Sequence, residues 1–469
     1  MYEKIKDMAY RDFIAVIDLG TSRLIGMVGQ KDSATGVISV LAFDEEETDH
    51  AIRRGIIFNI EKTAERIKRL VAKLEAKLKG GKIVKVYVGI GGQSLHSMDY
   101  SVVKEVAEEA VMTEEIKAFL LEDCRTFQPK GLVVYDIVSP TYYINDKLEQ
   151  NPVGVPYSKI EAHYKLIVGR PAIRRHIENT IERVGLELAG ILISPLALSD
   201  VVFSEDEKKL GCALVDFGAG VTSVTVMKGG KLDKLAVIPL GNDLITKDLT
   251  TLHLVESEAE RIKLEYGNAV ADLETEEAIR VNSVDGVGIR ELKLADVHYV
   301  IESRVKEILE NVFAQLGAED SLRGLGAGVV ITGGGADLRG LMEAMHKQLK
   351  MDIRWASLRS GLQKENMAVS VPEYYVALGL LSQGTVNCAY VPPAPVSPTP
   401  TQQEIFSGTE DSAESERIAK EKEEERKRKE EEQERKRQQG KTNNPTQKGF
   451  KKFIAKSAGK INDLFEGLD

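Results

Sequence analysis

FIAVIDLGTS, residues 13–22, joins an apolar run to an aspartate, a glycine and two hydroxyl residues. The run has the composition of a buried strand, and Asp18, Gly20, Thr21 and Ser22 stand at its end. A glycine in such a loop lets backbone N–H groups approach phosphate oxygens without a Cβ in the way. Taken alone, however, the stretch is more often a simple hairpin turn than a phosphate loop.

A second copy of the pattern makes a phosphate clamp the better interpretation. In GCALVDFGAGVTSVTVMKGG, residues 211–230, an apolar strand is followed by Asp216, Gly218, Gly220 and Thr222, and then by another apolar run. RLIGMVGQ follows the first loop in the same way. A duplicated strand-loop-strand unit, with copies about two hundred residues apart, is hard to obtain by chance.

The residue types of the two loops fit a nucleotide with its metal ion. Thr21, Ser22 and Thr222 can donate hydroxyl hydrogen bonds to phosphate oxygens. Asp18 and Asp216 cannot contact phosphates favourably, so we expect Mg²⁺ and its water shell to lie between them and the nucleotide.

Two further stretches supply surfaces for a nucleoside. GVVITGGGADLRGLMEAM, residues 328–345, predicts a strand that enters Gly333, Gly334 and Gly335 and a helix that follows. On its own it is equally well read as a tight strand-to-helix turn. In SEAERIKLEYG, Glu260 and Lys263 lie one helical turn apart on the same face, although most such pairs are ordinary surface ion pairs.

Four stretches, taken in their order along the chain, resemble the actin-like ATPase superfamily: IDLGTS, LVDFGAGVT, AERIK and ITGGGADLRGL. The resemblance implies two lobes with ATP and Mg²⁺ between them. The first phosphate loop would contain Asp18, Gly20, Thr21 and Ser22, and the second Asp216, Gly218, Gly220 and Thr222. It further implies that Glu260 and Lys263 reach the ribose and that Gly333, Gly334 and Gly335 line the adenosine.

Composition limits the remaining possibilities. A chain of 469 residues needs at least two domains, and alternating strand-like and helix-like stretches indicate α/β layers. The net charge of -10 argues against nucleic acid as a partner. The three cysteines are far apart, so we interpret them as reduced thiols. The sequence shows no signal-peptide core and no membrane-spanning stretch. We therefore expect a cytoplasmic protein.

The segment between residues 92 and 170 distinguishes members of the superfamily, because it predicts a compact α+β insertion. One helix is expected around MTEEIKAFLLEDC and strands at LVVYDIV, YYIND and AHYKLIV. This insertion resembles that of the FtsA family of bacterial cell-division proteins. Further stretches that resemble this family are GQSLHSMDY, IPLGNDLITKDLT, PEYYVALGLL and the terminal GFKKFIAKSAGKINDLFEGL.

That resemblance implies a protein that binds ATP, polymerises, tethers the FtsZ ring to the inner face of the cytoplasmic membrane at the septum and recruits later division proteins. The FtsZ C-terminal peptide would dock on residues 243–300. The predicted layout is: 1–91 and 168–206, first lobe (1A); 92–167, insertion (1C); 207–242 and 301–390, second lobe (2A); 243–300, subdomain 2B; 391–446, proline-rich and charged linker; 447–469, amphipathic helix.

The terminal helix predicts a peripheral membrane anchor. Its apolar stripe contains Phe450, Phe453, Ile454, Ile461, Leu464 and Phe465, and its flank contains Lys451, Lys452 and Lys456. A narrow apolar stripe beside lysines is typical of a helix that lies in the interface of an anionic bilayer. The alternative is a helix docked on the protein's own core or on a partner, but the long linker disfavours docking on the core.

Two other classes, and one relative within the same class, stay open. A kinase of the superfamily would need a catalytic aspartate near a substrate pocket, and no such motif is found in 92–170. A chaperone would need a β-rich peptide-binding domain where this chain has a charged linker. A pilus-assembly relative would share the insertion but lack the basic amphipathic C-terminus.

Slow or undetectable ATP hydrolysis is expected. DnaK-type chaperones place a Glu-Pro pair where this chain has Ser194 and Pro195, and a serine is a poor base at neutral pH. The alternative role for Ser194 is simply to cap the helix that follows.

Overall fold

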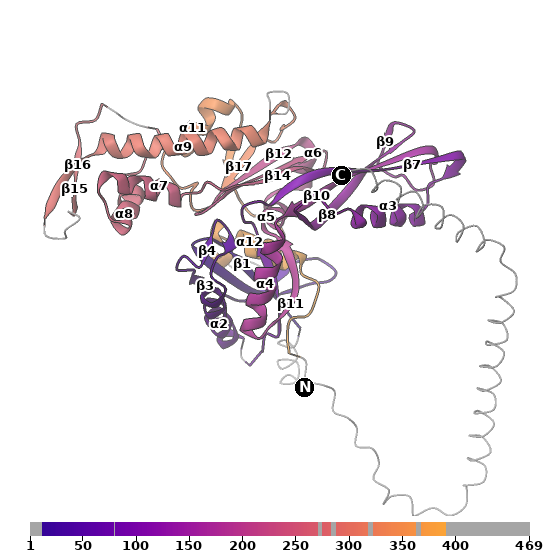
Figure 1. The fold of residues 1–469 in the computed structure, drawn as a ribbon, viewed down its shortest axis with the longest axis horizontal. Coiled ribbons are helices and arrows are strands. Elements are labelled where there is room, and N and C mark those ends of the chain that lie inside the picture. The colour runs from indigo at the N-terminus through magenta and orange to yellow at the C-terminus, as the bar shows by residue number, and fades with distance from the viewer. Residues whose placement is uncertain are drawn as a thin grey trace, which may run out of the picture. The chain divides into compact units, whose positions relative to one another are not determined.

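The computed structural model describes residues 12–78, 80–270, 274–282, 288–317, 322–362 and 367–390 (Figure 1). The linker predicted at 391–446 and the amphipathic helix predicted at 447–469 lie outside the described residues. Within the described part, strands and helices alternate in mixed α/β layers, which confirms the α/β part of the predicted fold class. Their arrangement brings both predicted phosphate loops to one cleft.

A five-stranded sheet forms the centre of the first lobe, with β1 in its middle. The strands in spatial order are β11 (Glu187–Ile193), β6 (Lys85–Ile90), β1 (Ile14–Leu19), β2 (Arg23–Lys31) and β3 (Ile38–Glu47). β1 pairs antiparallel with β2 and parallel with β6. Both β1 and β2 are apolar along most of their length because both faces of this sheet are covered.

Four helices and a short hairpin complete the first lobe: α2 (Ile60–Lys77), α4 (Pro171–Val184), α5 (Ser194–Val202), α12 (Tyr375–Gln383), and β4 (Ile52–Arg53) with β5 (Ile56–Ile57). α2 begins where the Asn59 side chain accepts a hydrogen bond from the Lys62 N–H, and it buries Ile67, Leu70 and Leu74 at helical spacing. α4 ends at Gly185, whose φ of 88° is left-handed.

The second lobe and the insertion share a nine-stranded sheet. Its spatial order is β18 (Ile353–Trp355), β17 (Val329–Thr332), β12 (Cys212–Phe217), β13 (Thr222–Lys228), β14 (Lys231–Ile238), β7 (His96–Val111), β10 (Pro156–Gly169), β8 (Val133–Ile144) and β9 (Lys147–Glu149). β12 pairs antiparallel with β13 and parallel with β17, as β1 does with β2 and β6. The duplication seen in the sequence is therefore also a duplication of strand topology.

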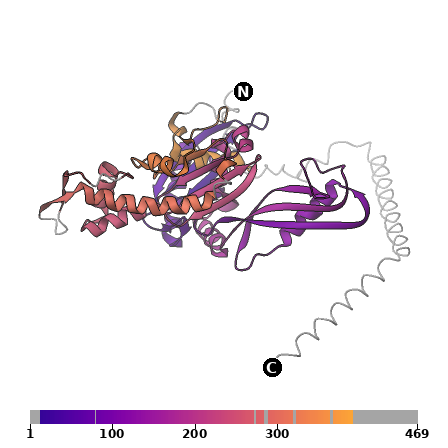
Figure 2. The same ribbon diagram turned by 90° about the horizontal axis from the view of Figure 1, so that it is seen from above.

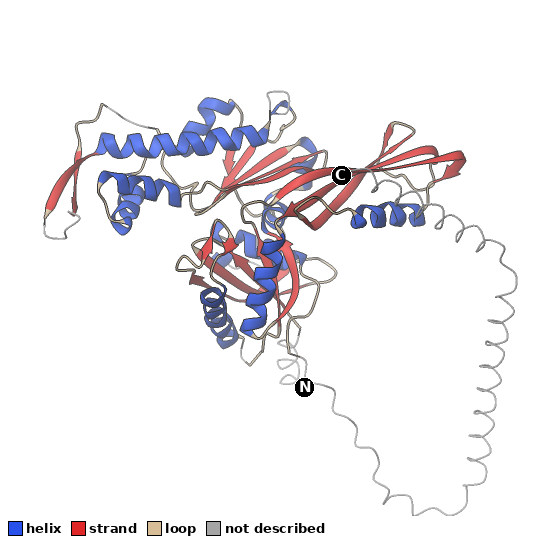
Figure 3. Cartoon of the chain, in the orientation of Figure 1, coloured by secondary structure: helices blue, strands red, loops and turns tan. Residues whose placement is uncertain are grey.

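The insertion has its own hydrophobic core, in which α3 (Glu114–Thr126) covers the sheet (Figure 3). Leu120 and Cys124 of α3 are buried together with Tyr157 and Tyr164 of β10. The predicted helix is confirmed. The strands predicted at LVVYDIV and YYIND are one long strand, β8, because a bulge accommodates Pro140 without ending the pairing with β10.

The rest of the second lobe is mainly helical. Its elements are α6 (Glu205–Leu210), α7 (Asp243–Leu249), η1 (Thr250–Leu252), α8 (Glu256–Tyr266), β15 (Ala278–Asn282), β16 (Ile289–Lys293), α9 (Leu294–Leu316) and α11 (Leu341–Leu349). Two short 3-10 helices, η2 (Met367–Val369) and η3 (Pro372–Tyr374), pack with the first lobe, where Val369 is buried in the core and the Tyr374 ring contacts Phe43. α9 is one continuous helix (Figure 2), so it runs through residue 300, where a boundary between subdomains is predicted. Within the described ranges, no helix is both long and apolar enough to cross a membrane.

Candidate functional site

The two predicted phosphate loops occupy equivalent places in the two lobes. Asp18 is the next-to-last residue of β1 and pairs with Ile25, and Asp216 is the next-to-last residue of β12 and pairs with Ser223. The loops touch, because a Cβ on Gly220 would lie 2.5 Å from Oγ1 of Thr21. Glycine at this position therefore permits the close approach of the two loops.

The loops open into a cleft of about 340 Å³, within the range of small-molecule sites. Twelve of the thirteen predicted nucleotide-binding residues line it: Asp18, Gly20, Thr21, Ser22, Asp216, Gly218, Gly220, Glu260, Lys263, Gly333, Gly334 and Gly335. Thr222 does not. The Thr222 side chain is fully buried, and its hydroxyl donates to the Leu240 carbonyl at 2.8 Å. Thr222 therefore stabilises the second loop through a contact outside the cleft.

The two aspartates lie in an environment that opposes two negative charges. Burial raises the pKa of Asp18 to about 6, against the effect of a hydrogen bond from Ser194. Burial, and after it the charge of Asp18, raises the pKa of Asp216 to about 6. A cation between the two carboxylates would remove this penalty.

Ser194 acts on Asp18. Its Oγ donates to Oδ1 of Asp18 at 2.7 Å, whereas Ile193 occupies the N-cap of α5 and makes no side-chain cap. The capping role considered for Ser194 is thus not what the structure shows. Gly89 leaves room for this pair, since a Cβ there would lie 2.7 Å from Oγ of Ser194.

The carboxylates of Asp18 and Asp216 suit a hydrated magnesium ion better than a metal ion whose ligands all come from the protein. Among the described residues, no three His, Cys, Asp or Glu side chains gather into a metal-binding group. Two carboxylates at a polar cleft are the kind of site at which Mg²⁺ keeps several waters and takes its other ligands from phosphate. Asp18 and Asp216 would hold such an ion through its water shell.

Glu260 and Lys263 face the cleft from α8 as one unit with Thr246. The Lys263 ammonium lies 2.7 Å from the Glu260 carboxylate and donates to the Thr246 hydroxyl at 2.9 Å, while that hydroxyl donates to Glu260. Lys263 is buried, so the pair is more than the ordinary surface contact considered from the sequence. The three side chains fix the orientation of a carboxylate and an ammonium beside the cleft.

The three glycines differ in what they do. Gly333 has a φ of 86°, and a Cβ there would collide with Asp216. The Gly335 N–H donates to the Phe217 carbonyl at 2.8 Å. A Cβ on Gly334 would meet no atom within 4 Å, so this backbone faces open space in the cleft. The helix expected directly after the glycines, α11, begins only at Leu341.

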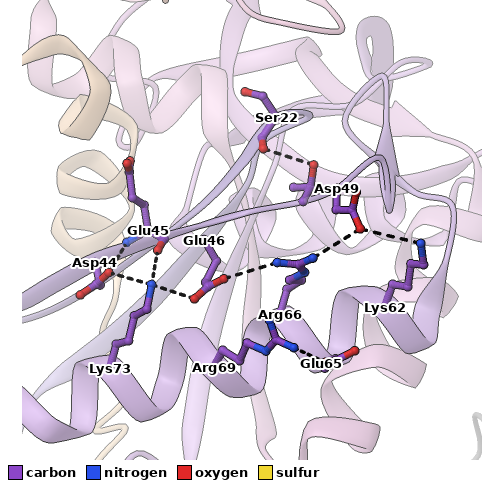
Figure 4. A network of polar contacts seen from close by, with 11 residues as sticks. Ser22, Asp44, Glu45, Glu46, Asp49, Lys62, Glu65, Arg66, Arg69 and Lys73 are labelled. Carbon is purple, nitrogen blue, oxygen red and sulfur yellow. Dashed lines mark hydrogen bonds and ion pairs between the residues drawn. The ribbon is translucent and has the colours of Figure 1, made fainter. Parts of the chain in front are cut away.

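A network of charges supports the first loop from outside, as Figure 4 shows. Arg66 of α2 lies 3.4 Å from Asp49 and 3.9 Å from Glu46. The neighbouring Thr48 donates its hydroxyl hydrogen to the Thr21 carbonyl at 2.5 Å, and its N–H donates to the Ser22 carbonyl at 3.0 Å. The first phosphate loop is therefore connected to α2 through Thr48 and Asp49.

Sequence reasoning missed several of these residues. Asn242, Asp243 and Thr246 follow the stretch IPLG, and Asn242 and Asp243 line the cleft. The Asn-Asp pair just before a helix was the available signal, since polar residues at a helix start can face a ligand. No local signal marks Thr48, because its role depends on contact with a loop 26 residues earlier in the chain.

Comparisons with known proteins point to one family. The family model described as cell division protein FtsA matches residues 213–379. The chain is 35% identical over 379 residues to the cell division protein FtsA of Porphyromonas gingivalis, which covers 80% of this chain and 78% of that protein. The chain is 29% identical over 371 residues to the cell division protein FtsA of Bacillus subtilis. That match covers 78% of this chain and 82% of the Bacillus subtilis protein.

Among solved structures, a chain of the PilM-PilN type IV pilus biogenesis complex is similar, with a TM-score of 0.53. The sequences are 17% identical, and the match covers 78% of this chain and 97% of that one. At this identity the likeness is one of fold alone.

The opposed aspartates predict a pH-dependent effect of Asp216→Asn in nucleotide-free, magnesium-free buffer. Because burial holds the folded-state pKa of Asp216 near 6, above its ordinary value of 3.8, ionisation costs the folded protein stability as pH rises through this range. The neutral variant avoids that cost, so we expect it to melt a few degrees above the unsubstituted protein at pH 8. The difference should vanish near pH 4.

Thermal unfolding followed by circular dichroism checks this. Asp206→Asn is the matched control, since the Asp206 side chain is 91% exposed and should show no such dependence. An unfolding midpoint of the Asp216 variant at or below that of the unsubstituted protein at pH 8 would contradict the assignment.

Proposed function

This chain belongs to the FtsA family of cell division proteins, and from that premise we propose that it is an ATP-binding, actin-like component of the bacterial division machinery. The observation that carries the nucleotide assignment is the pair of Asp-Gly loops that meet at one cleft. Backbone N–H groups and hydroxyls of the loops would hold the phosphates, and Asp18 and Asp216 would hold hydrated Mg²⁺.

The nucleoside would lie between α8 and the three glycines. Glu260 and Lys263 would contact the ribose, and the open backbone at Gly334 would face the adenosine. We propose slow turnover, because the cleft presents Ser194 where a stronger base could stand, and its hydroxyl is already used on Asp18. ATP would then act mainly as a ligand that favours one conformation, the one that polymerises.

We further propose that the FtsZ C-terminal peptide docks on residues 243–300. Large apolar side chains are exposed there, with Ile289 71% and Tyr299 60% exposed. Such exposed apolar side chains are candidates for anchors of a protein-binding surface. Binding there would connect the protein to the FtsZ ring, and other division proteins would join the same assembly.

The C-terminal segment 447–469 would attach the protein to the inner face of the cytoplasmic membrane. The support is its sequence pattern, an apolar stripe beside lysines that suits the interface of an anionic bilayer.

A pilus-assembly role is the second candidate, favoured by the shared fold with the PilM chain. The 35% identity to a cell division protein over most of the chain favours the division role.

A bulky residue at Gly334 should abolish ATP binding without unfolding the protein. A side chain there enters open space in the cleft and would occupy the adenosine position. We expect Gly334→Trp to weaken ATP binding by at least about a hundredfold in calorimetry, which corresponds to about 2.7 kcal/mol. Gly334→Ala is the control and should lose far less. Unchanged ATP affinity in the Trp variant would overturn the placement of the nucleoside.

Charged residues at exposed apolar positions of the 243–300 region should weaken binding of an FtsZ C-terminal peptide. We expect Ile289→Asp or Tyr299→Asp to lower its affinity about tenfold or more in a fluorescence titration, as loss of an interface anchor does. Val103→Asp is the control, because Val103 is also exposed, at 52%, but lies in the insertion. If the intact protein ignores the peptide, the FtsZ part of the proposal is wrong.

Loss of the terminal helix should release the protein from membranes and leave ATP binding intact. Deletion of 447–469, or Phe453→Glu, should abolish co-sedimentation with liposomes that contain anionic lipid, because each removes apolar contact with the bilayer. Phe453→Leu keeps an apolar side chain and should retain binding. Continued sedimentation of the truncated protein would show that the anchor lies elsewhere.

A further inference from the structure

Along one edge, strand β14 is hydrogen-bonded to β13, the strand that leads out of the second phosphate loop. β13 starts directly after that loop and pairs with β14 from Thr222↔Ile238 to Lys228↔Lys231. The Thr222 hydroxyl adds a hydrogen bond to the Leu240 carbonyl just beyond the end of β14. The strand and the loop therefore form one hydrogen-bonded unit.

The residues after β14 also fold back onto the loop. The Asn242 N–H donates to the Gly218 carbonyl at 3.0 Å, and the Asp243 N–H donates to the Ala219 carbonyl at 2.8 Å. Gly241 lies so close that a Cβ there would collide with the Ala219 carbonyl oxygen. A ligand that orders the second loop would thus restrain β14 from both its paired edge and its end.

The other edge of β14 contacts the insertion. Ala236 forms a bridge with His96, the Val237 N–H donates to the Leu95 carbonyl at 3.1 Å, and the Leu235 N–H donates to Oγ of Ser97 at 2.9 Å. We call these contacts, between Leu95–Ser97 and Leu235–Val237, the β14 joint.

A lysine makes a second contact at the opposite end of the strand. Nζ of Lys231 donates to the Pro140 carbonyl at 2.7 Å and to Oγ1 of Thr141 at 3.1 Å, both in β8. The bulge at Pro140 interrupts the register of β8 with β10 between Val138 and Thr141. Lys231 therefore contacts β8 at its bulge, where the strand is irregular.

The β14 joint is narrow, whereas the bodies on either side of it are not. Within the insertion, β10 and β7 pair without interruption from Lys159 to Val168. Leu232, Leu235 and Val237 of β14 are buried in a large hydrophobic core that they share with strands and helices of the first lobe. A strand packed in this way transmits a displacement to its edges because its side chains have no free volume in which to absorb it.

We propose that nucleotide in the cleft and the conformation of the insertion are coupled through β14. The proposal rests on the nucleotide site proposed above. Occupied phosphate loops hold β14 in place, and β14 fixes the β14 joint and the Lys231 contact. These contacts act on the position of the insertion together with its contact to the first lobe, in which the Tyr135 hydroxyl bonds to the backbone of Arg170 and Arg174. Because such coupling is reciprocal, a partner that binds the insertion and shifts it changes nucleotide affinity by the same factor.

Hydrogen exchange read by mass spectrometry tests this on the full chain, with calorimetry run in parallel to measure ATP binding. Mg·ATP should slow exchange of the Leu235 and Val237 amides and of residues 95–98 by about fivefold or more, a coupling of ordinary size. The double variant Ser97→Ala, Lys231→Met removes the side-chain hydrogen bonds of both connections and leaves the backbone contacts of Leu95 and His96 in place. In that variant ATP should still bind, but the slowing at residues 95–98 should be smaller than in the unsubstituted protein.

Lys165→Met is the matched control. Lys165 makes its ion pair with Asp99 inside the insertion, at 2.6 Å, so this variant should keep the response of the unsubstituted protein. If ATP binds to the unsubstituted protein and exchange at 95–98 and 235–237 does not change, the coupling is refuted and the nucleotide site stands. If calorimetry detects no ATP binding, both proposals fail.

Discussion

Two carboxylates with hindered ionisation, Asp18 and Asp216, face one cleft, and the rest of the site is arranged around them. Each stands at the same place in a repeated strand topology, so duplication itself brings the two charges together. Burial raises the pKa of both to about 6. A hydrated divalent cation with a phosphate ligand is the partner that the chemistry of this pair suits.

The two loops are supported in different ways. The first loop is tied through Thr48 to a charge network on α2, which belongs to the first lobe alone. The second loop is tied through β13 and β14 to a sheet that continues into the insertion. A ligand that bridged both loops would therefore contact one support that belongs to the first lobe and one that leads to the insertion.

The sequence was informative where function depends on local order along the chain. An apolar strand, an aspartate and a glycine are neighbours in the chain, so Asp18 and Asp216 could be assigned to loops before their proximity was known. The pairing of Glu260 with Lys263 followed from helical spacing. The helix of the insertion, α3, was likewise predictable from its own residues.

Sequence reasoning failed where a side chain's role depends on distant contacts. Thr222 looks like a phosphate donor in sequence, yet its hydroxyl reaches the Leu240 carbonyl. Asp243 and Thr246 lie on another helix than Glu260. Only the fold brings Asp243 to the cleft and the Thr246 hydroxyl to the Glu260 carboxylate. The contact of Lys231 with β8 spans 91 residues of sequence and depends on a bulge. No pattern of apolar and polar residues encodes such contacts.

The central claim is that Asp18 and Asp216 bind a nucleotide through a divalent cation, and calorimetric titration of the intact protein with ATP tests it most directly. The titration is run once with Mg²⁺ and once with EDTA. The account predicts saturable binding with one site per chain in Mg²⁺, and affinity at least about tenfold weaker in EDTA, a difference of about 1.4 kcal/mol. No binding, or equal affinity in the two buffers, would contradict it.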